Sequence, residues 1–473
     1  MPGCREADPA AQASSETVEE AAAPQPNLVL ITLDTTRADH LGSYGHARPT
    51  SPHLDRLAEQ GVRFDVAYSA AASTAPSHAT LFTGQHPPAH GLVKNGLGLR
   101  AGGGMPTLAR RLQDAGYDTA GIVSSFVLHR SFGFADGFAH YDDSFIPAEA
   151  TQLESEWQER EVPGRVFDRR AGAATHRARR WLNRKRDRSK PFFLFVHYFD
   201  PHLQHVAPEP YQSRMLEGRE APLPERKAGK PIDPETFDLD YTLRSYDAEI
   251  AYTDDAVRAL LDSLERQGLV QDTLVVVTAD HGEGLMSHGV LSHAIDLHEE
   301  AVRVPWLMRW PGVLRAGQVV RAPVGAVDLH ATMLGLLGVP VSRLPGRDVS
   351  AALRAGREPA ASTPVFFYRR LYERPTRLGW LRHFLLQGTQ EGVRLGRWKL
   401  VEVSHGEDLL FDLDADPDER INRIGEEPER VAGLRALLAK RRAADAEWGG
   451  EERVEAALDD EQRAALEALG YVE

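Results

Sequence analysis

The strongest constraint on the fold is a set of continuous apolar runs that recur along the chain. Each run has the length of a β-strand and lacks polar alternation, as is typical of strands buried on both faces of a parallel sheet. Helical patterns lie between the runs, for example at Asp254–Gln267, where apolar residues recur along one stripe. We therefore predict an α/β fold with a large, mostly parallel β-sheet flanked by helices. The runs are Leu28–Ile31, Gly121–Val123, Phe192–Val196, Leu274–Val277 and Val304–Met308.

Polar side chains follow two of these runs at the points where the strands are expected to end. Asp34 comes after the first run, and Asp280 and His281 come after the fourth, 246 positions later. An isolated Asp at a strand end is commonly a turn or helix-capping residue. In an open α/β sheet, however, ligands bind beyond the carboxyl ends of the strands. These three side chains are therefore candidates for a single site at that edge.

The composition is that of a globular enzyme and argues against a nucleic-acid partner. Of the 473 residues 42% are hydrophobic, and the formal net charge of −14 gives no general attraction to nucleic acid or to an anionic membrane. The single cysteine, Cys4, excludes an intramolecular disulfide framework and a thiolate metal cluster. No apolar stretch approaches the ~20 residues of a membrane-spanning helix, so we expect no transmembrane segment. The oligomeric state is left open.

The N-terminus supports two interpretations of the compartment. As written, it lacks the basic region and apolar run of a secretory signal, which predicts a cytoplasmic protein. The alternative starts from Pro2–Cys4, which resembles the end of a lipoprotein cleavage site without its apolar run. If the true start lies upstream, Cys4 would carry lipid and the protein would be periplasmic and lipid-anchored.

The segment Thr74–Gly84, TAPSHATLFTG, resembles the active-site signature of the sulfatase family, within the alkaline phosphatase superfamily. Sulfatases carry at its first position a Cys or Ser that is oxidised to formylglycine, whereas Thr74 cannot be converted in this way. His78 stands where the family has arginine. Further segments resemble the family in its own order, from about residue 27 to residue 440. They are Asn27–Gly45, Pro88–Gly91, His197–His202, Ala279–Gly284, Glu299–Pro305, Trp398–Leu400 and Leu410–Pro417.

The resemblance implies one metal centre. Asp34, Asp280 and His281 take the positions at which the family binds its divalent cation, and Thr74 takes the position of the nucleophile and contacts the same ion. Thr35 stands where many sulfatases have another acidic ligand, and His281 where they often have asparagine. Because imidazole with few carboxylates suits zinc or manganese better than calcium, we favour zinc or manganese, with calcium as the alternative.

The resemblance also implies candidates for contact with the substrate. His202 and His293 lie near positions that contact the anionic ester or protonate its leaving oxygen, and His78 is a third candidate for this role. Asn95 and Asp200 are assigned to substrate binding. The D-x-x-x-H spacing that holds a second zinc in related phosphodiesterases is absent after Asp200, so we expect a single metal ion, with a second, weak site at Asp200, His202 and His293 as the alternative.

The predicted reaction is hydrolysis of a sulfate, phosphate or phosphonate ester through a metal-activated Thr74 hydroxyl. The ester formed on the threonine can be broken only by a second displacement at its central atom, which favours phosphate and phosphonate esters. The family resemblance favours sulfate esters. The substrate would be an anionic ester of a small molecule, glycan or lipid. The alternatives are a catalytically silent protein that binds anionic sugars or lipids, and a phosphoryl-group transferase.

Four regions are expected along the chain. Residues 1–26 have the Ala-, Glu- and Pro-rich composition of a disordered tail. Residues 27–330 form the catalytic domain, and residues 331–445 form a small C-terminal α+β subdomain like that of the sulfatase family. Residues 446–473 are predicted to form a helical tail.

Overall fold

The computed structural model describes residues 25–100, 105–150, 167–202, 205–219, 237–340, 343–376, 386–448, 454–456, 458–460 and 462–463. Nearly all of the tail predicted at residues 1–26 lies outside this part of the chain. Within it, none of the helices combines the length and the apolar character needed to cross a bilayer.

A central eight-stranded sheet forms the body of the molecule and confirms the predicted fold class. Five adjacent strands, β8, β1, β7, β5 and β6, are parallel, and β9 runs antiparallel to both β8 and β2. All five apolar runs predicted from the sequence overlap these strands. In spatial order the strands are β10 (Gln318–Val320), β2 (Val62–Phe64), β9 (Trp306–Arg309), β8 (Thr273–Ala279), β1 (Asn27–Leu33), β7 (Phe192–Tyr198), β5 (Asp118–Ile122) and β6 (His140–Asp142).

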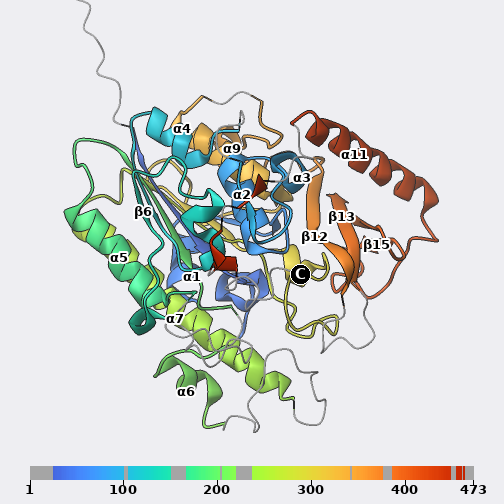
Figure 1. Cartoon of the computed structure of the whole chain (residues 1–473), viewed down its shortest axis with the longest axis horizontal. Helices are drawn as coiled ribbons and strands as arrows, with labels where there is room; N and C mark the ends of the chain where they lie inside the picture. The colour runs from blue at the N-terminus through green and yellow to red at the C-terminus, as the bar shows by residue number, and fades with distance from the viewer. Residues whose placement is uncertain are drawn as a thin grey trace, which may run out of the picture.

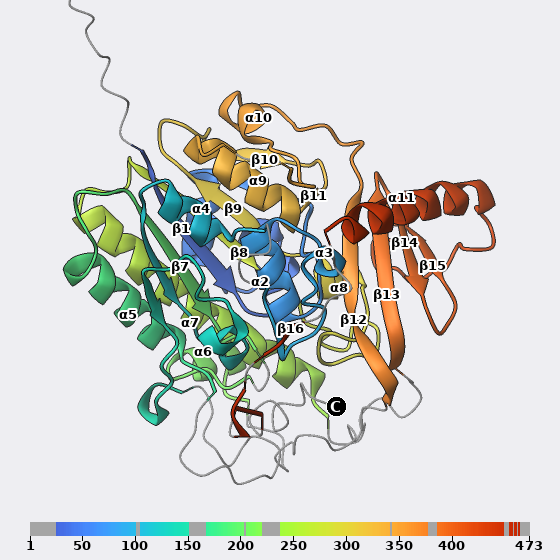
Figure 2. The ribbon, with the colours of Figure 1, turned by 45° about the horizontal axis from the view of Figure 1, so that its top comes forward.

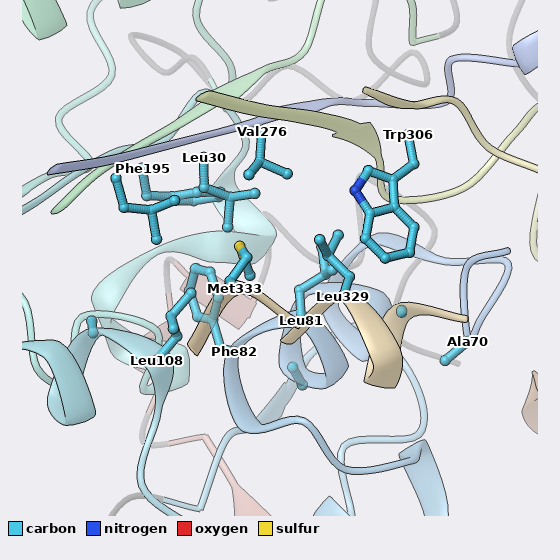
Figure 3. Close-up of a cluster of buried hydrophobic side chains, with 14 of the residues drawn as sticks. Leu30, Ala70, Leu81, Phe82, Leu108, Phe195, Val276, Trp306, Leu329 and Met333 are labelled. Atoms are coloured by element: carbon cyan, nitrogen blue, oxygen red, sulfur yellow. The ribbon is translucent and has the colours of Figure 1, made fainter. Parts of the chain in front are cut away.

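Alternate residues of the central strands point into two separate cores, one on each face of the sheet. Leu30 of β1, Phe195 of β7 and Val276 of β8 face the core covered by α2 (Thr74–Thr83), α4 (Leu108–Asp114) and α9 (Ala326–Leu337). Figure 3 shows these strand side chains above Leu81 and Phe82 of α2 and Met333 of α9. Their neighbours in sequence, such as Ile31 and Val277, belong to the opposite core.

The opposite core is covered by α1 (Pro52–Glu59), α5 (Ala171–Arg184) and α7 (Leu239–Arg266), and α5 and α7 lie along the same face of the sheet in Figure 2. The helix predicted at Asp254–Gln267 is the second half of α7. It begins earlier, at Leu239, because Asp238 caps it by accepting a hydrogen bond from Tyr241 N.

The C-terminal part forms an antiparallel sheet with one covering helix, beside the main sheet (Figure 1). Its strands are β12 (Val365–Thr376), β13 (Leu386–Leu395), β14 (Trp398–Val403) and β15 (Leu409–Asp412). Helix α11 (Pro428–Ala446) packs Leu434 and Leu438 against Leu400 and Leu410. This is the predicted small α+β subdomain. The boundary expected at residue 330 falls within helix α9, which is continuous from Ala326 to Leu337.

The remaining elements are short. The two-stranded sheets pair β3 (Ala67–Tyr68) with β11 (Val324–Gly325), and β4 (Leu97–Gly98) with β16 (Val454–Glu455). In the predicted helical tail, the described residues 454–455 thus form a strand and residues 460, 462 and 463 are helical, and the rest of the predicted helix lies outside the described residues. The short helices are α3 (Pro87–His90), α6 (Tyr211–Leu216), α8 (Glu299–Val302) and α10 (Ser350–Arg354).

Candidate active site

Asp34, Asp280 and His281 meet at the carboxyl edge of the central sheet and are called the ligand cluster here. Strands β1 and β8 are parallel neighbours with Leu33 opposite Ala279, so the residues that follow them emerge side by side. His281 Nε2 lies 3.7 Å from Asp34 Oδ1 and 3.4 Å from Asp280 Oδ2. One potential ligand atom from each residue lies within 4.8 Å of the others, and all three side chains are fully buried.

Thr74 is the first residue of helix α2, and its hydroxyl faces the ligand cluster. Thr74 Oγ1 lies 3.2 Å from His281 Nε2. Two contacts fix this end of the helix: Asn95 Oδ1 accepts a hydrogen bond from Ala75 N at 2.9 Å, and Ser77 Oγ donates to Asp280 O at 2.5 Å. The start of α2 is therefore bonded directly to the end of β8, which holds the threonine over the ligand cluster.

The ligand cluster fits a divalent cation. Among the described residues, none gives a well-aligned hydrogen bond to either carboxylate oxygen of Asp34 or to Asp280 Oδ2, although these atoms are buried. Burial raises the pKa of both carboxyl groups. Burial also opposes the charge of His281, yet Asp280 and Asp34 outweigh it and raise its pKa. Asp280 Oδ1 accepts hydrogen bonds from Thr35 N and His281 N, whereas the other three buried oxygens need a counter-charge, so the site favours a bound cation.

His197 is a site residue that the sequence reasoning missed. It lies on β7 opposite Thr32 of β1, and its Nε2 lies 3.2 Å from Asp34 Oδ2. Its other nitrogen, Nδ1, accepts a hydrogen bond from Ser124 N at 3.3 Å, which places the ring proton on Nε2, facing Asp34. His197 therefore lies beside this carboxylate, where residues that surround metal ligands are found in proteins, although the two atoms are not aligned for a hydrogen bond.

His78 links the backbone of Thr74 to strand β1 through hydrogen bonds. Its Nδ1 donates to Thr74 O at 2.8 Å, and its Nε2 accepts from Thr32 Oγ1 at 2.9 Å. Burial lowers the pKa of His78 to about 3, so the ring is neutral. One nitrogen of His78 also lies within 4.8 Å of potential ligand atoms of His197 and Asp280. Because both His78 nitrogens are already engaged, this second group is less suited to a cation than the ligand cluster.

Two further histidines extend outward from His281. The ring of His293 lies 4.4 Å from that of His281, and the ring of His202 lies 5.0 Å from that of His293. His293 Nδ1 is 3.3 Å from both carboxylate oxygens of Glu283, a buried residue that the sequence reasoning did not single out. The carboxylate orients the ring and leaves its Nε2 for other contacts.

Asn95 and Asp200, assigned to the substrate from the sequence, are both engaged with helix N-termini. Asn95 caps α2 through Ala75 N, as described above. Asp200 Oδ2 accepts a hydrogen bond from Ala171 N at 2.5 Å, at the first residue of α5. Burial raises the pKa of Asp200 to about 7. In this structure both side chains act on the protein's own backbone, and Asn95 reaches the site through the helix that carries Thr74.

Thr35 does not complete the ligand cluster. It has a left-handed backbone with φ of 50°, and its hydroxyl donates to Pro201 O at 2.8 Å. Tyr246 holds this turn in place, because its hydroxyl donates to Thr35 O at 2.7 Å and accepts from Arg37 N at 2.8 Å. The turn brings Thr35 N to 3.2 Å from Asp280 Oδ1, so this residue orients a carboxylate through its backbone.

Comparison with known proteins gives a consistent family. A family model described as sulfatase matches residues 26–339, and one described as N-sulphoglucosamine sulphohydrolase, C-terminal, matches residues 288–443. The ulvan-active sulfatase of Formosa agariphila is 26% identical to the chain over 468 residues, which cover 92% of this chain and 84% of the relative.

Solved structures share the fold over nearly the whole chain. The structure of a protein in complex with its substrate D-glucosamine-2-N,6-O-disulfate superposes with a TM-score of 0.71 at 22% identity, covering 89% of this chain and 98% of that chain. The phosphonate monoester hydrolase of Agrobacterium radiobacter gives a TM-score of 0.70 at 23% identity, with 89% and 96% covered. With the family model matching well over half of the residues, the chain belongs to the sulfatase family of the alkaline phosphatase superfamily and is a sulfuric or phosphoric ester hydrolase.

Proposed function

We propose that the protein hydrolyses anionic esters with Thr74 as nucleophile and with a divalent cation held by Asp34, Asp280 and His281. The observation that carries this proposal is the position of Thr74 Oγ1, 3.2 Å from His281 Nε2 and beside buried carboxylate oxygens that lack aligned hydrogen bonds. A hydroxyl in that position is placed both for activation and for attack.

Each residue of the site is assigned a separate role in the proposed reaction. A threonine hydroxyl is a weak nucleophile at neutral pH; a bound cation would supply the positive charge that lowers its pKa and polarises the ester. The neutral ring of His78 fixes the backbone of Thr74 through Thr74 O. To His202 and His293 we assign the exchange of protons with the leaving oxygen and with the attacking water.

The side chain of Thr74 favours phosphorus over sulfur. Attack by the hydroxyl forms an ester between Thr74 Oγ1 and the central atom, and the alcohol leaves with a proton. Unlike a formylglycine hydrate, this ester cannot collapse to an aldehyde. Water must therefore displace Thr74 at the same central atom, which is the double displacement that suits phosphate and phosphonate esters. Sulfate esters are the alternative substrates, in keeping with the sulfatase relatives.

The donor set favours zinc or manganese over calcium. Calcium takes six to eight oxygen ligands, whereas the cluster offers two carboxylates, an imidazole and a hydroxyl. Thr35, which occupies the position of a further acid in many sulfatases, gives its hydroxyl to Pro201 O instead. The substrate class we infer is an anionic ester on a sugar or another small alcohol, since a structural neighbour is in complex with a disulfated glucosamine.

The test compares wild type with Thr74→Ala and Thr74→Ser on matched 4-nitrophenyl phosphate, phenylphosphonate and sulfate esters, after element analysis of the purified protein. We expect one zinc or manganese per chain, fastest turnover of a phosphorus ester, a loss of roughly 10³-fold or more in Thr74→Ala, and partial retention in Thr74→Ser. Thr83→Ala is the matched control, because the Thr83 hydroxyl bonds only to backbone at the end of α2, donating to Ala79 O and accepting from Gln85 N.

Each other outcome assigns a different function. Equal turnover by wild type and Thr74→Ala would contradict the nucleophile. No turnover of any ester by metal-loaded wild type would favour a catalytically silent protein that binds anionic sugars or lipids. Turnover that requires an added alcohol, with the phosphoryl group recovered on it, would favour a transferase.

A further inference from the structure

A second group of metal-binding side chains lies beside helix α8, outside the ligand cluster. His288, His298 and Glu300 each place one potential ligand atom within 4.8 Å of the others. We call these three residues the α8 cluster. Two imidazoles and a carboxylate at this separation form a donor set that metal ions use in proteins, so the contacts of each residue decide whether a cation fits.

The α8 cluster joins the tip of a tight turn to a helix. Met286 N donates to Val290 O at 2.7 Å, which closes the turn around His288. His298 immediately precedes α8, and Glu300 is the second residue of that helix. The three side chains therefore come from two separate backbone segments, which a shared ion would hold together.

His288 faces oxygen atoms with both of its ring nitrogens. Its Nδ1 lies 2.6 Å from Glu300 Oε1, and its Nε2 lies 3.4 Å from Glu419 O. A neutral imidazole carries one proton and donates from only one nitrogen. With a cation on Nδ1, the proton would reside on Nε2 and point to the carbonyl, the arrangement that commonly orients a histidine ligand.

His298 completes the group from the other side of the His288 ring. The two rings are stacked, with centres 3.8 Å apart and an angle of 7° between their planes. His298 Nδ1 lies 3.4 Å from Asp296 Oδ1 and is buried without an aligned hydrogen bond. A carboxylate next to one nitrogen of an imidazole is also a common neighbour of metal-bound histidine.

The charges around the α8 cluster favour a cation. Glu300 and Asp296 are both buried, and in the described part of the chain no arginine or lysine forms an ion pair with either carboxylate. The nearby ammonium group of Lys399 is held by Glu299 and Glu419, at 3.0 and 2.9 Å. Protonation of both stacked rings would place like charges face to face, so two carboxylates share at most one imidazolium. A net negative charge remains.

The donors suit zinc better than calcium or magnesium, which take shells of oxygen ligands. Zinc with three protein ligands keeps a water molecule in the fourth position. The side chains of His288 and His298 are 17% and 16% exposed, so solvent can supply that water. The proton between His288 and Glu300 is no obstacle, because an imidazole can release it and become a ligand, whereas an arginine beside a carboxylate cannot.

We propose that His288, His298 and Glu300 bind a second zinc ion, more weakly than the ligand cluster binds its cation. Binding is weaker because zinc must displace the proton between His288 and Glu300 and because the site is partly open to solvent. The site therefore fills when zinc is supplied beyond the one ion per chain expected after purification. A zinc ion there would tie the turn to α8 and fix the segment that carries His293.

The test is a calorimetric titration of zinc into wild-type protein that already holds one equivalent. We expect one further zinc per chain and no binding of calcium. His288→Gln and Glu300→Gln should each weaken this second step by roughly 100-fold or more, since loss of a ligand exceeds the effect of losing a residue that only orients one. His405→Gln is the matched control, because His405 is an exposed histidine whose ring contacts Ser404 Oγ.

Thermal unfolding gives a second reading and reports the fold of each variant without zinc. Added zinc should raise the Tm of wild type by a few degrees and should leave the Tm of His288→Gln unchanged. Two results would overturn the inference: no second zinc in wild type, or a second zinc that binds both variants as tightly as wild type.

Asp280→Asn separates this site from the ligand cluster. The variant should lose ester hydrolysis and still bind the added zinc, whereas loss of the added zinc would assign that ion to the ligand cluster and overturn the inference. Wild type that cleaves no ester and yet binds the second zinc through His288 and Glu300 would refute the hydrolase proposal and retain the zinc site.

Discussion

Two groups of buried histidine and aspartate look alike in composition and differ in how the carboxylates are satisfied. The ligand cluster and the group His40, His46 and Asp247 each place potential ligand atoms within 4.8 Å of one another. In the second group His40 Nδ1 lies 2.7 Å from Asp247 Oδ1, and His46 Nε2 lies 3.1 Å from Asp247 Oδ2. Arg48 also binds Asp247 Oδ2, so a cationic side chain already occupies the place of a metal ion.

The pKa directions express this difference. Burial opposes the charge of Asp247, yet its contacts with His40 and His46 hold its pKa far below the ordinary range. Burial raises the pKa of Asp34 and Asp280, because no comparable set of donors compensates it. A residue count alone would rank the two groups equally. Whether each carboxylate oxygen is already paired with a side-chain donor distinguishes a structural network from a candidate cation site.

Loss of a ligand carboxylate should have the largest effect. We expect Asp280→Asn to lose the bound cation and to reduce kcat/KM on the order of 10³-fold or more, because the amide removes a charge from a site built around a cation. Element analysis and steady-state kinetics measure both. Asp34→Asn is the parallel variant, and Tm should not fall in the metal-free protein, since a buried charge is removed. Full metal content in both variants would show that the cation binds elsewhere.

Loss of the Asp247 carboxylate, in the group with His40 and His46, should lower stability and leave the metal in place. Asp247→Ala leaves His40 and Arg48 without their carboxylate, which should cost about 3 kcal/mol of unfolding free energy. Urea denaturation measures this loss, and element analysis should return the wild-type metal content. A variant of normal stability that lost its metal would reverse the assignment of the two groups.

Loss of the His197 imidazole beside Asp34 should have a smaller effect. His197→Phe keeps the ring volume on β7 and removes the Nε2 atom that lies 3.2 Å from Asp34 Oδ2. Metal affinity should fall about 10- to 100-fold, the usual effect of losing a residue that positions a ligand. Competition with a chelator gives the affinity. Unchanged affinity would mean that Asp34 is held by β1 alone.

The sequence predicts best what depends on local pattern and strand ends. The apolar runs locate the strands, and parallel pairing brings Asp34 and Asp280 to one edge whatever lies between them. His197 escapes this reasoning because it sits within β7, and only the register with Thr32 shows that it faces Asp34. His78 follows Thr74 by one helical turn, which places it near the site. Its hydrogen bonds to Thr32 and Thr74 depend on packing.

Contacts between distant elements are not predictable in this way. Tyr372 on β12 stands 78 positions beyond Ala294, and no spacing in the sequence predicts the hydrogen bond that its hydroxyl donates to Ala294 O. The same is true of Asp200, where the motif placed a substrate contact and the structure has a bond to Ala171 N at the start of α5. Whether a buried carboxylate meets a ligand, an arginine or a helix N-terminus is decided by tertiary packing.

Asp254 is a buried carboxylate that meets a helix N-terminus, and its replacement should have the smallest effect on stability. It is buried on α7 and accepts hydrogen bonds from His53 N at 3.0 Å and Leu54 N at 2.8 Å, at the start of α1. Burial outweighs these bonds and raises its pKa from 3.8 to about 7. A raised carboxyl pKa means that the folded state favours the proton, so its contribution to stability is present below pH 4 and is lost as pH rises through 7.

Replacing Asp254 with asparagine removes this titration. The variant loses one of the two acceptors and should be less stable than wild type at pH 5, but the deficit should shrink towards pH 8 by at most about 1.4 kcal/mol per pH unit. Urea unfolding of both proteins at four pH values gives the difference, in which the other titrating groups cancel. A deficit independent of pH would mean that Asp254 is ionised throughout. The two backbone amides would then be sufficient counter-charge for a buried carboxylate, and the missing hydrogen bonds at both oxygens of Asp34 would become the sharper sign of a cation.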